Sequence, residues 1–104
     1  MPVQAIPIEL GGESHTLRYD FRALARLEKE FGTPIVDIGE RLKGKLNLAD
    51  LTILLWTGLL HEDKSMTQEK AEDLVGGEDI LYLASKVTEA LTAAFPTVKE
   101  PLKN

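Results

Sequence analysis

A chain of 104 residues is long enough for one compact domain, and 43% hydrophobic with 28% charged residues is typical of a folded protein rather than a disordered one. The absence of cysteine excludes disulfides, thiolate metal sites and cysteine nucleophiles. The net charge of −5 argues against a nucleic-acid partner. No apolar run approaches the roughly 20 residues of a membrane helix, and no basic leader is visible, so we expect no membrane partner and a cytoplasmic location.

The acidic charge is concentrated in one part of the chain. Between Glu62 and Asp79 the acids outnumber the lysines by five, so the remainder is neutral overall. Arg41, Lys43 and Lys45 form a small basic cluster in a glycine-containing loop, too small for a nucleic-acid footprint. A small transcription regulator, which needs a basic recognition helix, is therefore disfavoured.

The first segment predicts a β-hairpin over residues 3–19. Its apolar residues alternate with Pro7 and Glu9, and Gly11-Gly12 supplies a two-residue turn with positive φ. This register places Ile8 opposite His15 and Ile6 opposite Leu17. Because a lone hairpin is marginal in water, we expect its apolar face to pack on a helical body.

Two helices follow the hairpin. Asp20 is a suitable N-cap for a helix that ends at Phe31, with Gly32 as its C-terminal stop. Its predicted buried stripe contains Phe21, Leu24, Leu27 and Phe31, while Arg22, Arg26, Lys29 and Glu30 face water. A shorter helix after Thr33-Pro34 carries one apolar edge.

The stretch from Asn47 to Leu60 is the most apolar in the chain, and its apolar positions cover more than half of a helix surface. Asn47 is a good N-cap, and the polar residues after Leu60 end the helix. A helix that is apolar on most faces is usually buried, so this segment is the predicted centre of the fold.

Two further helices complete the domain. Capping and glycine signals predict a short acidic helix over 68–75 and a longer one over 79–95, which Pro96 ends. The last helix is expected to bury Ile80 and Leu83 together with further apolar residues. We therefore predict an α+β, mainly α domain over residues 1–95, with the N-terminal hairpin packed on a bundle of four to five short helices and a flexible tail over 96–104.

Candidate catalytic and metal-binding residues form no recognisable constellation. His15 and His61 have no nucleophile or second histidine nearby in sequence, and residues 61–65 lack the second histidine of a zinc-protease helix. Glu69 and Asp73 are one helical turn apart, but a solvated acidic face explains them more simply than a cation site. We expect no enzyme, cofactor or metal.

The central and last helices contain more apolar positions than one buried stripe needs. The surplus predicts a partner-binding surface, because a large exposed apolar patch usually marks an interface. Its candidate residues are Ile53, Trp56, Leu60, Leu81 and Tyr82. The alternative for Trp56 is a core position whose indole N–H finds a hydrogen-bond acceptor.

The order of elements resembles a known family. Its most specific pieces are Ala-Leu-Ala-x-Leu-Glu-x-x-Phe-Gly over 23–32 and Leu-Leu-Trp-x-Gly-Leu over 54–59. With these blocks, residues 4–95 resemble the tail assembly chaperones of long-tailed bacteriophages and the related small tail proteins of gene transfer agents.

The resemblance implies an accessory protein of the host cytoplasm that self-associates, coats the long helical tape-measure protein and is absent from the finished particle. It also implies that a longer form, made by a ribosomal frameshift, can exist. The family contributes no catalytic residues. The main alternative is a structural tail tube or joining component that stays in the particle.

Overall fold

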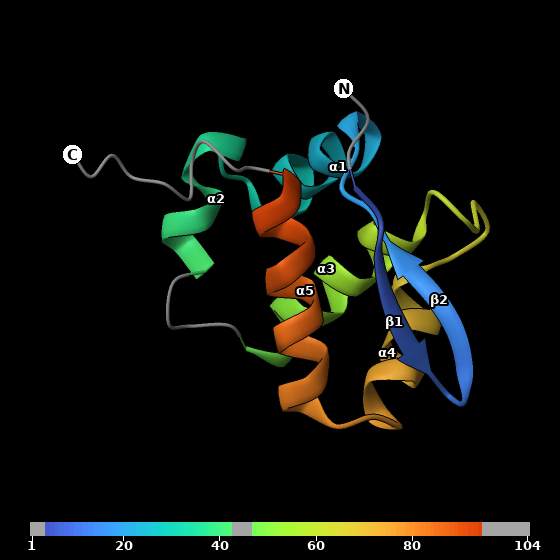
Figure 1. Ribbon diagram of the computed structural model, residues 1–104. Helices are drawn as coiled ribbons and strands as arrows, with labels where there is room; N and C mark the ends of the chain where they lie inside the picture. The colour runs from blue at the N-terminus through green and yellow to red at the C-terminus, as the bar shows by residue number, and fades with distance from the viewer. Residues whose placement is uncertain (1–3, 43–46, 95–104) are drawn as a thin grey trace.

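The computed structural model describes residues 4–42 and 47–94, and for positions 39, 41 and 42 only the backbone. Figure 1 shows its elements: β1 (Ile6–Leu10), β2 (Glu13–Leu17), α1 (Phe21–Phe31), α2 (Ile35–Leu42), α3 (Leu48–Leu59), α4 (Gln68–Gly76) and α5 (Ile80–Ala94). The predicted fold class is confirmed, since an N-terminal antiparallel hairpin packs on a mainly helical body. The predicted tail over 96–104 and the side chains of the Arg41, Lys43 and Lys45 cluster lie outside this description.

The hairpin has the predicted register. Ile8 pairs with His15 and Ile6 pairs with Leu17, and the turn glycines Gly11 and Gly12 have φ of 58° and 81°. Residues of β1 alternate between buried and exposed, as expected for a strand with one face on the core. The Ile8 side chain faces the core and is almost completely buried.

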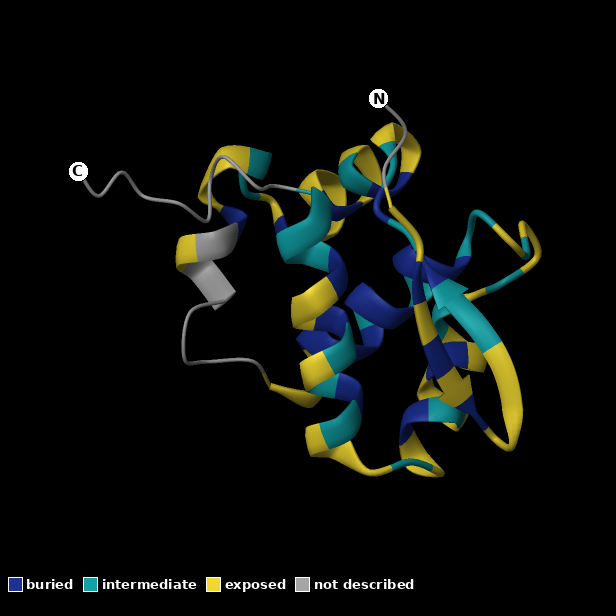
Figure 2. Ribbon diagram, in the orientation of Figure 1, coloured by how far each residue is buried: buried dark blue, intermediate teal, exposed yellow. Residues whose placement is uncertain are grey.

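Helix α3 is the centre of the domain. Contacts connect it to α1, α4, α5 and β2, and Figure 2 shows most of its surface as buried. The Asn47 side chain accepts a hydrogen bond from the Asp50 backbone N–H at 2.8 Å, which confirms the predicted N-cap. Four leucines of this helix are fully buried: Leu51, Leu54, Leu55 and Leu59.

The hairpin packs closely on α3 at the contact between Tyr19 and Gly58. Tyr19 is completely buried, and its hydroxyl donates a hydrogen bond to the Leu54 carbonyl at 2.5 Å. Burial raises the pKa of Tyr19, so the hydroxyl keeps its proton as the donor. The Arg18 backbone N–H donates to the Gly58 carbonyl at 2.9 Å. A Cβ at Gly58 would lie 2.9 Å from both the Tyr19 hydroxyl and the Leu17 Cδ2 atom.

Some predicted core positions are wrong, all of them at the first residue of a helix. Phe21 is 85% exposed and Ile80 is 39% exposed, although both were expected in buried stripes. Leu48, counted among the apolar positions of the central helix, is 59% exposed. On α1 the buried side runs through Ala23, Leu27 and Phe31, and Phe21 lies on the opposite side of the helix.

We predict that Gly58→Ala destabilises the fold, although alanine is the better helix former. The new methyl group would overlap Leu17 and Tyr19, and overpacking of this kind costs about 1 to 3 kcal/mol. Gly76→Ala is the matched control, because a Cβ there meets nothing within 4 Å and stability should change by less than about 1 kcal/mol. Urea denaturation measures both. Equal stability of the two variants would contradict the close approach at Gly58.

Candidate partner-binding surface

The predicted partner-binding residues lie at two places. Ile53 and Trp56 are on α3 and Leu60 is its C-cap, whereas Leu81 and Tyr82 lie in the first turn of α5, which begins near the bottom of the molecule in Figure 1. Leu81 is 79% exposed, and the other four are partly buried. The five residues therefore do not form one continuous patch.

Two of the five already have internal roles. The Tyr82 hydroxyl accepts a hydrogen bond from the Glu9 backbone N–H at 2.9 Å, which joins α5 to β1. Glu78 accepts from the Gly11 backbone N–H at 2.5 Å and strengthens the same junction. Ile53 packs against the core cluster. Tyr82 and Ile53 thus contribute mainly to the packing of the domain.

Trp56 combines both interpretations considered from the sequence. Its indole N–H donates to the Met66 carbonyl at 3.1 Å, so the expected acceptor is present. The ring remains partly exposed, and the Arg26 guanidinium carbon lies 5.7 Å from its centroid, within the range of a cation–π contact. Trp56 therefore forms part of the surface between α1 and α3.

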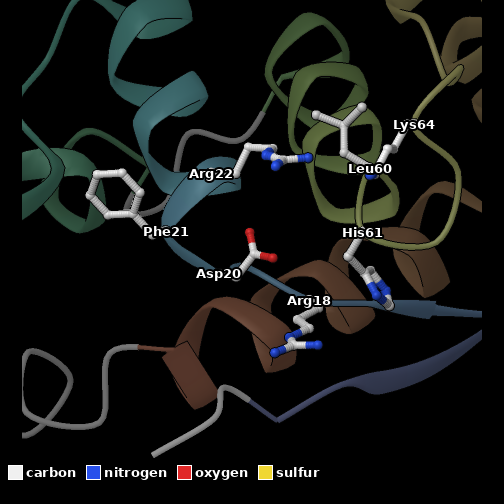
Figure 3. Close-up of a pocket in the computed structure, with 7 residues that line it drawn as sticks. All are labelled: Arg18, Asp20, Phe21, Arg22, Leu60, His61 and Lys64. Atoms are coloured by element: carbon white, nitrogen blue, oxygen red, sulfur yellow. The ribbon is translucent and has the colours of Figure 1, made fainter.

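A hollow of about 440 Å³ opens between the start of α1 and the segment that follows α3 (Figure 3). Leu60 and Phe21 supply its apolar lining, with the Phe21 ring at one edge. The other lining residues are mostly cationic or titratable: Arg18, Arg22, His61, Lys64 and the single acid Asp20. Asp20 is already used as the α1 N-cap, accepting from the Ala23 N–H at 3.1 Å. The hollow thus combines two apolar side chains with a lining that is mostly cationic.

Arg18 has an unsatisfied donor at this site. Its Nε atom is buried and has no hydrogen-bond partner within the described residues. A buried N–H without an acceptor is costly, so this donor lowers the stability of the free domain.

A second hollow, of about 540 Å³, lies along the outer surface of α1. Phe21, Arg22, Ala25, Arg26 and Lys29 line it, and we call these residues the basic face of α1. The face lies opposite the side on which Ala23, Leu27 and Phe31 are buried. Sequence reasoning placed its cations in water but did not recognise them as one surface; their spacing by three and four residues was the available signal.

Below the first hollow, a polar cluster connects β2 to the segment after α3. Glu62 accepts hydrogen bonds from His15 at 2.5 Å and from the Thr16 backbone N–H at 3.1 Å, and His61 Nε2 donates to the Thr16 carbonyl at 2.9 Å. Partial burial alone would raise the pKa of Glu62, but the hydrogen bonds from His15 and Thr16 outweigh it and lower the pKa. Both histidines are accounted for by this structural cluster.

Within residues 4–42 and 47–94 there is no group of three or more His, Asp or Glu side chains placed to hold a metal ion. In the same part of the chain, no helix combines the length and apolar character needed to cross a bilayer.

We predict that Glu62→Gln lowers stability at neutral pH and flattens its dependence on acid. Because the folded-state pKa of Glu62 lies below its ordinary value of 4.5, its stabilisation is fully present above that value and is lost as the pH falls through the folded pKa. Urea midpoints between about pH 7 and pH 3 measure this effect. Parallel curves for the variant and the wild type would show that the cluster contributes no pH-dependent stability.

Comparison with known proteins places the chain in a family. Residues 4–97 match the family described as "Phage tail tube protein, GTA-gp10", which is nearly the whole chain. No curated protein and no solved structure matches it. The chain belongs to this family of phage tail proteins.

Proposed function

We propose that this protein is a tail assembly chaperone that self-associates and binds the tape-measure protein during tail morphogenesis. Its membership of a phage tail family supports a role in building the tail. The observation that carries the chaperone role is the apolar surface between α1 and α3, where Phe21 is 85% exposed and the partly exposed Leu60 lines the same hollow. Surface of this kind suits contact with another chain.

The physical task of such a chaperone is to cover the apolar side of a long helix until the tail tube forms around it. The hollow lined by Leu60 and Phe21 is large enough for an apolar side chain, and Arg18, Arg22 and Lys64 in its lining favour acidic residues beside that side chain. Each copy would contribute one weak contact with the tape-measure helix. Several copies together would bind it firmly, and the complex would remain reversible because each contact is weak.

We assign the tape-measure contact to the α1–α3 surface that contains Trp56 and Leu60. Both are partly exposed, and Leu60 lines the hollow directly. The proposal requires no cofactor or catalytic residue and places the protein in the host cytoplasm. It is compatible with a longer frameshifted form that carries the same domain.

A structural tail tube or joining component is the second candidate. The family is described as a tail tube protein, which favours this function directly. A tube subunit remains in the finished particle, whereas a chaperone leaves before the tube closes. Mass spectrometry of purified particles separates them: the chaperone proposal predicts that this chain is absent, and a stoichiometric amount would establish a structural component instead.

Co-expression with the tape-measure protein tests the contact itself. We predict that the tape-measure protein becomes soluble and elutes with this chain. Leu60→Ser should weaken the complex at least about tenfold, because it removes one of the two apolar side chains that line the hollow. Val36→Ser is the matched control, since it changes an exposed apolar residue of α2 that does not line the hollow.

An insoluble tape-measure protein with no complex would contradict the chaperone role. Equal binding by the Leu60 and Val36 variants would leave the role intact and show that the α1–α3 surface is the wrong site. Circular dichroism of each variant establishes that the domain remains folded.

A further inference from the structure

The domain carries two helix faces of opposite charge that cannot reach each other. The basic face of α1 contains Arg22, Arg26 and Lys29, one or two helical turns apart. On α4, Glu69, Glu72 and Asp73 are all exposed and lie opposite the side that buries Ala71 and Val75; we call them the acidic face of α4. Both faces are open to solvent (Figure 2).

Neither face is neutralised within the described part of the chain. Arg22 and Lys29 form no hydrogen bond or ion pair there, and neither do the side chains of Glu69, Glu72 and Asp73. Glu28 beside the basic face and Lys70 beside the acidic face each form a hydrogen bond with the backbone. Glu28 accepts from the Ile35 backbone N–H at 2.7 Å, and Lys70 donates to the Ser65 carbonyl at 3.4 Å. Glu30, at the edge of the basic face, is exposed and reduces its charge without cancelling it.

The arrangement of the helices keeps the faces apart. Helix α3 contacts both α1 and α4, and Figure 1 shows α1 near the top of the molecule and α4 near the bottom. The two faces therefore point outward on different sides of the central helix, and only a second molecule can bring them together.

We propose that the basic face of α1 in one copy binds the acidic face of α4 in the next copy, head to tail. Opposite charges on the two surfaces select this pairing, and like charges oppose contacts between two α1 faces or two α4 faces. A head-to-tail contact uses different surfaces on the two partners, so it propagates into a ring or a filament rather than stopping at a dimer.

Apolar side chains lie next to both faces and can anchor the contact. Phe21, 85% exposed, is at the start of α1, and the strongly exposed Leu81 follows the short turn after α4. Phe21 lies between Asp20, which caps α1, and Arg22 of the basic face, whereas Leu81 follows the acids Glu78 and Asp79. Apolar burial would supply part of the affinity, while the charges set the orientation.

This inference deepens the self-association in the proposed function and rests on it, but its test leaves out the tape-measure protein, so either contact can fail alone. Sedimentation velocity of the full chain measures the association. Wild type should associate in a concentration-dependent manner. Raising the salt from about 0.1 M to about 1 M, which shortens the screening length from about 10 Å to about 3 Å, should weaken the association.

Charge reversal tests the pairing of the two faces. The variant Arg22→Glu with Lys29→Glu should lose at least about tenfold in association constant, and so should Glu72→Lys with Asp73→Lys. Mixing these two variants should restore assembly, because each supplies the complement that the other has lost. Glu13→Lys, which alters an exposed charge on the hairpin, is the control and should associate like wild type.

Several results would overturn the proposal. A wild-type chain that is monomeric up to about 1 mM has no useful self-contact. Variants that associate as wild type does, or a mixture of folded variants that stays monomeric, would show that these faces do not pair. If wild type bound a DNA duplex through Arg22 and Lys29 while self-association was unaffected by their reversal, the basic face would serve a different partner.

Discussion

The packing of Tyr19 over Gly58 is the contact on which the rest of the structure depends. The tyrosine hydroxyl satisfies the Leu54 carbonyl inside the core, and the missing side chain at position 58 lets the hairpin approach the helix closely. This fixes the end of α3 against β2. It also positions the following segment, where Glu62 and His61 bind the edge of the hairpin and Leu60 faces α1. The candidate surface is thus built on a rigid junction.

Much of the fold followed from local chemistry that a sequence displays directly. The glycine turn, the alternation in β1 and the Asn47 cap each have one simple structural solution, and each was found as predicted. The central position of α3 followed from its excess of apolar residues. These features depend on neighbours within a few residues along the chain, so no knowledge of the tertiary arrangement was needed.

The candidate surface was harder to predict because residues from separate segments form it, and their relative positions depend on the tertiary packing of the helices. Phe21 was expected in the buried stripe of α1, yet the buried side runs through Ala23, Leu27 and Phe31 and leaves Phe21 exposed. Likewise, Arg18, Arg22 and Lys64 come from separate segments, and only the fold brings them around one hollow. A net charge of −5 concealed this local positive region.

The opposite charges on α1 and α4 give a physical basis for the proposed assembly of several copies of this domain. Acidic residues on α4 and cations on α1 make the molecule directional, while exposed apolar residues next to each supply area to bury. A directional subunit can line up along an extended partner, which is the geometry that tail construction requires. The family assignment and the distribution of surface chemistry therefore support the same class of role.

Hydrogen exchange of the backbone amides, measured for the free protein and for its complex with the tape-measure protein, tests the central claim most directly. The account predicts slower exchange on binding at the start of α1 and the end of α3, around Phe21 and Leu60, with β1 and β2 unchanged. A complex that protects only the hairpin, or protects none of these amides, would contradict the claim that this exposed surface holds another chain.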